Sequence, residues 1–166
     1  MVQQTRRMLN LLLCMTACCG SLCAQTEKTV TLRMLDGKSG KLITTSSFLV
    51  RIDHQQTVHG NWVTQNENGT GKLTVPGEAA LLSVRATYDS STSVYANCDA
   101  NKDIGSSDRG PALDRWYEIS DILATGVMAP NNCIGKKVPN HPQVFAIPGE
   151  FVFFVRRLNT VEQFRE

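Results

Sequence analysis

The stretch Phe151-Val152-Phe153-Phe154-Val155 is apolar at every position and lies near the end of a chain of 166 residues. A strand with one face in water alternates apolar and polar side chains, so a run with no polar member indicates that both faces are covered. We therefore expect a central strand, or a strand whose outer face lies under a loop. A Pro148-Gly149 turn precedes it, and residues 144–147 are expected to form a further short strand.

Earlier parts of the chain show the alternation that is typical of half-buried strands. In residues 29–35, Val30, Leu32 and Met34 share one face of the predicted strand. The sequence Asp36-Gly37-Lys38-Ser39-Gly40 then predicts a turn, because glycine and aspartate supply the backbone angles that a turn needs. The same two-residue period recurs in residues 48–53 and 80–88.

One connection carries a strong hairpin pattern. Residues 62–64 and 72–75 read as strands, and the sequence between them contains Asn68-Gly69. This dipeptide favours tight two-residue turns between paired strands. We therefore expect these two strands to pair with each other in antiparallel fashion.

These patterns together predict an all-β chain. Short strands follow one another with few helices and no strand–helix–strand repeat, which favours a single antiparallel β-sandwich of seven to eight strands. One short helix is expected near residues 120–126, with Ser120 as its cap and Gly126 at its end. Because no linker or repeat divides residues 25–166, we expect them to form one domain.

Residues 1–24 have the three-part layout of a secretory signal peptide. Two arginines give a basic start, residues 8–19 are almost entirely apolar or small, and Ala24 supplies a small residue at the cleavage point. We expect a secreted or periplasmic protein that begins at Gln25. No transmembrane segment is expected after signal cleavage, because no later apolar run is long enough to span a bilayer.

Two other export routes stay open. Residues 5–9 (Thr-Arg-Arg-Met-Leu) loosely match a twin-arginine signal. Residues 15–18 (Met-Thr-Ala-Cys) loosely resemble a lipoprotein cleavage box. The second route would leave a lipid tether at Cys18 in place of a free domain.

Cleavage after Ala24 would also remove four of the six cysteines. Only Cys98 and Cys133 remain, and in an oxidising compartment a single pair is expected to form a disulfide. A catalytic or metal-binding cysteine is the alternative. The remaining chain has 15 basic and 15 acidic residues, so it lacks the positive charge by which proteins bind nucleic acid.

Two motifs resemble those of carboxypeptidase regulatory-like domains. The first is the strand and turn of residues 30–43, although Leu42 stands where that family usually has proline. The second covers residues 64–76, where Asn68-Gly69 precedes a strand and a proline. The resemblance covers about residues 28–90. It implies a prealbumin-like, or carbohydrate-binding-like, β-sandwich related to the immunoglobulin-like sandwiches, serving as an accessory or structural module.

The family name does not imply peptidase activity here. A zinc carboxypeptidase needs a His-x-x-Glu pair, and neither His54 nor His59 is followed by a glutamate at that spacing. No nucleophile elbow and no phosphate-binding loop occurs. We therefore expect a non-catalytic protein without a cofactor, acting as a binding or accessory module for an unknown protein or glycan partner.

Two weaker candidate sites involve residues 99–117, and the second of them also involves Trp62. Asp99, Asn101 and Asp103 carry alternating oxygen donors, like the start of a calcium loop, although Ile104 stands at the position that favours glycine. A flat aromatic ring can stack on a sugar. The alternative function is thus a carbohydrate-binding accessory or small hydrolase that uses this region. The three aromatic candidates for a binding surface are Trp62, Trp116 and Tyr117.

Overall fold

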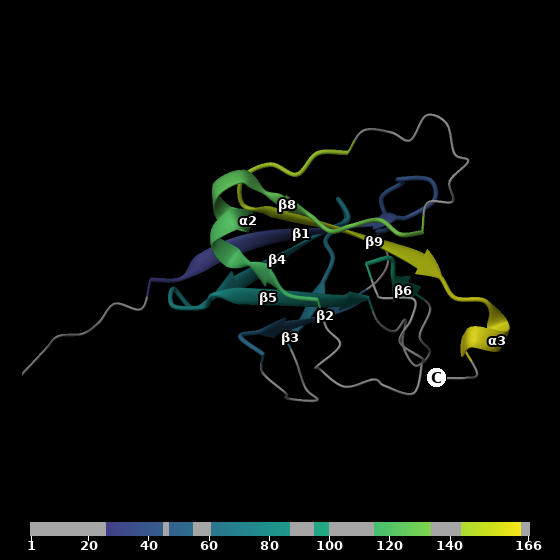
Figure 1. Ribbon diagram of the computed structural model, residues 1–166, viewed down its shortest axis with the longest axis horizontal. Coiled ribbons are helices and arrows are strands. Elements are labelled where there is room, and N and C mark those ends of the chain that lie inside the picture. The colour runs from purple at the N-terminus through teal and green to yellow at the C-terminus, as the bar shows by residue number, and fades with distance from the viewer. Residues whose placement is uncertain are drawn as a thin grey trace, which may run out of the picture.

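Figure 1 shows the computed structural model as an all-β chain with little helix. The structure describes residues 26–44, 47–54, 61–86, 95–99, 115–133 and 144–163. The expected all-β class is confirmed, since these residues form two sheets, one helix of seven residues (α2, Ile119–Thr125) and a single helical turn (α3, Thr160–Gln163). Neither helix in this part of the chain has the length and apolar composition needed to cross a membrane.

The first sheet is built around β9 (Glu150–Arg157). On one side of β9 lies β1 (Lys28–Asp36), and β4 (Thr70–Val75) follows beyond β1. On the other side, β8 (Val127–Met128) pairs with the beginning of β9 and β6 (Tyr95–Asn97) with its end. The expected central position of this strand is therefore confirmed.

The expectation of purely antiparallel pairing is wrong for this sheet. Both β1 and β8 run parallel to β9, with Leu32 opposite Phe151 and Val127 opposite the same residue. Parallel neighbours need a long connection between them. The chain supplies one between β1 and β9, because the whole second sheet is formed between these two strands.

The second sheet has four strands and is antiparallel throughout. Its order is β3 (Asn61–Thr64), β2 (Ser47–Ile52), β5 (Leu81–Ala86) and β7 (Tyr117–Glu118). One apolar core joins the inner faces of the two sheets in a sandwich-like arrangement. Phe48 of β2 meets Phe153 of β9 edge to face, with ring centroids 5.4 Å apart. 

A second apolar cluster covers the opposite face of β9. Val152 and Phe154 are 0% and 6% exposed, although they alternate with the residues that face the shared core. Leu35 and Cys98 are buried with them, and Val144 and Ala146 pack against them. The prediction that both faces of residues 151–155 are covered is confirmed.

The segment that covers this face is not the strand that we expected. Residues 144–147 form no ladder and run as a loop that leaves Phe145 and Ile147 exposed. The Arg33 guanidinium holds the loop by donating to the carbonyl oxygen of Phe145 at 2.7 Å. Arg33 also forms a two-point ion pair with the buried Glu150, at 2.9 and 3.0 Å. A loop thus completes the burial of β9.

The predicted hairpin between β3 and β4 is also wrong. A tight turn does form, because Asn66 Oδ1 accepts hydrogen bonds from the backbone of Asn68 and Thr70, and Gly69 has a positive φ of 70°. The two strands nevertheless belong to different sheets. A Cβ at Gly71 would lie 2.5 Å from Val63 Cγ1, so the strands meet face to face across the core.

The helix near residues 120–126 is confirmed, with one difference at its start. Ser120 is not the cap, because α2 begins at Ile119 and Glu118 precedes it in an extended conformation. Ile119 and Ile122 are buried in the shared core, which favours the earlier start. Gly126 ends the helix as predicted, with a positive φ of 78°.

Substituting Gly71 tests whether β3 and β4 pack face to face across the core. We expect Gly71→Ala to lower the free energy of unfolding by about 1–3 kcal/mol, because the added methyl meets Val63 and Phe48 in a filled core. Thr74→Ala, at an exposed position of the same strand, is the matched control. Urea unfolding of both variants gives the comparison. Equal stability of the Gly71 variant and the natural chain would contradict this face-to-face packing of β3 and β4.

Candidate functional site

The disulfide between Cys98 and Cys133 is present, which confirms the pairing expected from the sequence. Their sulfur atoms are 2.01 Å apart and Cys98 is 3% exposed. The backbone on both sides of the bridge is also fixed. Cys98 donates its N–H to the carbonyl oxygen of Phe154 at 2.8 Å, and the N–H of Asn132 donates to the carbonyl oxygen of Cys98 at 3.1 Å.

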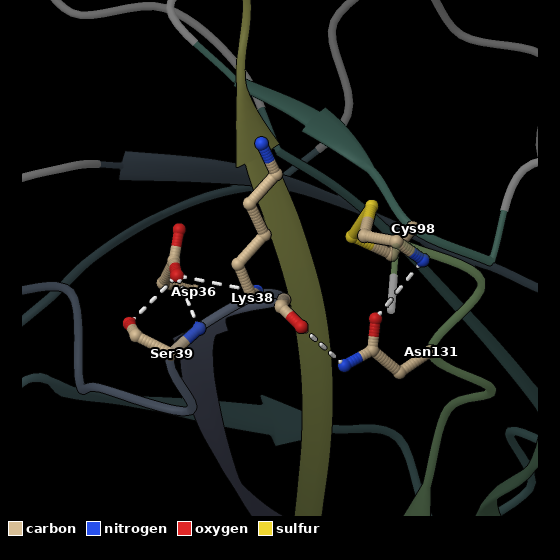
Figure 2. Close-up of a disulfide and its surroundings, with 7 residues drawn as sticks. Asp36, Lys38, Ser39, Cys98 and Asn131 are labelled. Atoms are coloured by element: carbon tan, nitrogen blue, oxygen red, sulfur yellow. Dashed lines mark hydrogen bonds between the residues drawn. A yellow bond between two sulfur atoms is a disulfide. The ribbon is translucent and has the colours of Figure 1, made fainter. Parts of the chain in front are cut away.

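The turn that follows β1 sits directly on this bridge (Figure 2). Gly37 is buried, and a Cβ there would lie 2.6 Å from Cys98 Sγ and 2.8 Å from Cys133 Cβ. Its N–H donates to Val155, and its carbonyl oxygen accepts from the Asn131 amide at 2.8 Å. Only glycine fits here, because any side chain would displace the disulfide or the turn.

Asp36 organises the same turn. Its Oδ1 accepts hydrogen bonds from the hydroxyl and N–H of Ser39, both at 2.7 Å, and from the N–H of Lys38 at 3.2 Å. Partial burial by itself raises the pKa of Asp36, but these hydrogen bonds and the Lys38 charge outweigh burial and hold the pKa below its ordinary value. The predicted turn over residues 36–40 is confirmed.

An open pocket of about 320 Å³ lies between this turn and the end of β9. Asp36 and Lys38 were expected as turn residues only, and no pattern in the sequence predicted a pocket. The only local pattern was the adjacent pair Arg156-Arg157, and Lys38 joins them only through the pairing of β1 with β9. The lining residues are Asp36, Lys38, Arg156, Arg157 and Asn159.

Of the three predicted calcium ligands, only Asp99 lies within the described residues. Its side chain is largely buried, and Oδ2 accepts a hydrogen bond from the Tyr117 hydroxyl at 2.6 Å. Asn101 and Asp103 lie outside the described residues. Within the described ranges, no three histidine, cysteine or acidic residues gather closely enough to hold a metal ion. The calcium loop stays a prediction.

Tyr117 is half-buried and packs against the shared core. Its ring lies 4.6 Å from that of Phe151, between centroids. Burial, and then the hydrogen bond and negative charge of Asp99, raise the pKa of Tyr117 well above its ordinary value. The phenol is therefore held as a neutral hydrogen-bond donor.

The two tryptophans are not brought together with Tyr117 on one surface. Trp116 is half-buried, and its ring lies 4.3 Å from that of His54. Trp62 is 53% exposed and belongs to β3, whereas β7 lies at the opposite edge of the same sheet. Trp62 pairs with Leu49, and this pair faces away from the shared core. A single three-ring sugar platform is therefore not formed.

Comparison with known proteins adds no match at the level of family, homologue or fold. No protein-family model, curated protein or solved structure matches this chain. The resemblance to carboxypeptidase regulatory-like domains thus stays a hypothesis that depends on its two motifs.

The lowered pKa of Asp36 predicts a dependence of stability on acid. Asp36 stabilises the fold above its unfolded pKa, near 3.8, and this contribution is lost as the pH falls through the lower folded value. Ser39→Ala removes one hydrogen-bond donor, so we expect a higher Asp36 pKa and a smaller loss of stability in acid. NMR titration of the carboxyl group measures the pKa directly.

The exposed Ser120, in the first turn of α2, supplies the control. Ser120→Ala should leave the Asp36 titration unchanged. An Asp36 pKa that is the same in the natural chain and in Ser39→Ala would contradict the assigned role of the Ser39 hydroxyl.

Proposed function

We propose that this chain is an exported, non-catalytic β-sandwich module that binds or supports a partner. The observation that carries the proposal is the disulfide between Cys98 and Cys133, the only two cysteines after residue 24. Buried disulfides persist in oxidising compartments and are rare in the cytosol. The bridge therefore supports the reading of residues 1–24 as a signal peptide, with a secreted or periplasmic product.

The bonding of four acidic side chains in the described part of the chain supports a non-catalytic role. Asp36 and Asp99 accept hydrogen bonds from the turn and from Tyr117, as described above. Asp53 Oδ1 accepts two backbone N–H groups where β5 begins, at 2.9 and 2.8 Å. Glu150 pairs with Arg33. A general acid or base must reach a substrate, whereas each of these carboxylates is bonded to the fold itself.

The family proposal follows the two motifs. In support, residues 36–40 form the turn after β1, and residues 66–70 form a second tight turn before β4. These are the positions at which the motifs of carboxypeptidase regulatory-like domains would place turns. The finer fold, a single prealbumin-like sandwich of seven to eight strands, is part of this proposal.

A carbohydrate-binding accessory role is the second candidate. The observation that favours it is Trp62, whose side chain is 53% exposed on an edge strand. A flat indole ring in this position can stack on a pyranose, which buries apolar surface at little entropic cost. A site in residues 99–117, including a small hydrolase site, stays a prediction because most of that region lies outside the described residues.

Intact mass spectrometry tests the export proposal. Protein recovered from an exporting host is expected to begin at Gln25 and to gain the mass of two hydrogen atoms on reduction, from one disulfide. A product that begins at Cys18 with attached lipid would identify the lipoprotein route. A retained leader, or no gain in mass on reduction, would contradict the proposal.

Glycan-array binding of the natural chain and of Trp62→Ala tests the second candidate. If Trp62 stacks on sugar, its removal should weaken binding on the order of tenfold or more, because stacking on an exposed ring carries much of the affinity at such sites. Trp116→Ala is the comparison, since that ring packs against His54. Equal binding of Trp62→Ala and the natural chain would exclude this role for Trp62.

A further inference from the structure

The pocket between the turn after β1 and the end of β9 collects positive charge. Three of its five lining residues are the cations Lys38, Arg156 and Arg157, and one is the acid Asp36. Residues 25–166 as a whole are balanced, with as many acidic as basic side chains. The pocket thus concentrates a net charge of two positives on a part of the chain whose total charge is zero.

The single acid of the pocket is hydrogen-bonded to the turn that follows it. Asp36 Oδ1 accepts all three hydrogen bonds from the turn, so this oxygen is directed at Lys38 N–H and Ser39. The side chains of Lys38 and Arg157 are exposed to solvent at the pocket. An anion in the pocket can therefore approach two cationic groups from different elements.

The turn that carries Lys38 is fixed by contacts with the disulfide and with Asn131. Gly37 contacts both cysteines of the bridge, and Asn131 binds the carbonyl oxygen of Gly37. Figure 2 shows Asp36 and Ser39 on one side of Lys38, with Asn131 and the disulfide on the other. Arg156 and Arg157 belong to the end of β9, where they pair with Ala96 and Tyr95 of β6. Binding thus needs little ordering of backbone.

We propose that this pocket binds a tetrahedral oxyanion, the phosphate or sulfate group of a ligand. Arginine guanidinium groups match the oxygen geometry of such anions and donate two parallel hydrogen bonds, while lysine adds a point charge. The amide of Asn159 adds a neutral polar group to the lining. This inference goes beyond the proposed function and does not depend on it, since the pocket exists whether or not the chain is exported.

The test is an NMR titration of the folded, oxidised protein with two probes at low salt. Sodium pyrophosphate represents phosphate groups, and a sulfated disaccharide represents sulfated glycans. We expect saturable shifts of the amide signals of Lys38, Ser39 and Arg157 with at least one probe. The unsulfated disaccharide should cause none of these shifts, and the preferred probe distinguishes the two sources of the anion.

Variants locate the binding. Lys38→Gln and Arg157→Gln are each expected to raise the dissociation constant about tenfold, because each removes one charge-assisted contact. Lys72→Gln, an exposed lysine on β4, is the matched control and should leave the constant unchanged. Asp36→Asn keeps an oxygen for the turn and removes the opposing charge, so it should lower the constant.

Some results would overturn the proposal. The first is the absence of saturable shifts with both probes in the correctly folded protein. The second is an equal loss of affinity in Lys72→Gln and Lys38→Gln, which would mean that the anion associates with surface charge in general. Neither result would affect the export proposal, because the mass measurement is independent of anion binding.

Discussion

Burial of both faces of β9 is the constraint on which the rest of the structure depends. Five successive apolar side chains leave no face of residues 151–155 that can remain in water. Each such side chain contributes about 1.5–3 kcal/mol when it is removed from water, so exposure of either face would cost several kcal/mol. The second sheet covers one face through Phe48 and its neighbours. The other face requires the disulfide and the loop of residues 144–147.

The disulfide therefore has a structural role beyond linking two loops. It spans 35 residues, for which the chain-entropy account predicts about 3–4 kcal/mol of stabilisation. It also belongs to the second apolar cluster, with Phe154, on the face of β9 opposite the shared core. Gly37 packs directly against it. The turn after β1, which carries Lys38, and the covered outer face of β9 consequently both depend on contacts with the disulfide. Recognition at this end of the molecule would depend on the same contacts that hold the core.

The sequence predicts those features that depend on local patterns. The apolar run at 151–155 predicted a strand covered on both faces, and the helix ending at Gly126 was located from local residue preferences. Features set by distant partners were missed. Asn68-Gly69 does form a turn, yet β3 pairs with β2 and β4 pairs with β1, so the two strands belong to different sheets. The pocket likewise joins Lys38 to Arg157 only through the parallel pairing of β1 with β9, which no local pattern encodes.

Amide hydrogen exchange in the oxidised and reduced protein tests most directly whether β9 is covered on both faces. Exchange of a core amide requires opening of the structure around it, so its rate reports how completely the strand is held. We predict that amides 151–155 are among the slowest to exchange in the oxidised protein. We also predict that reduction of the disulfide accelerates them more than the amides of β2. Exchange of residues 151–155 as fast as that of the edge strand β3, in the oxidised protein, would contradict this structure.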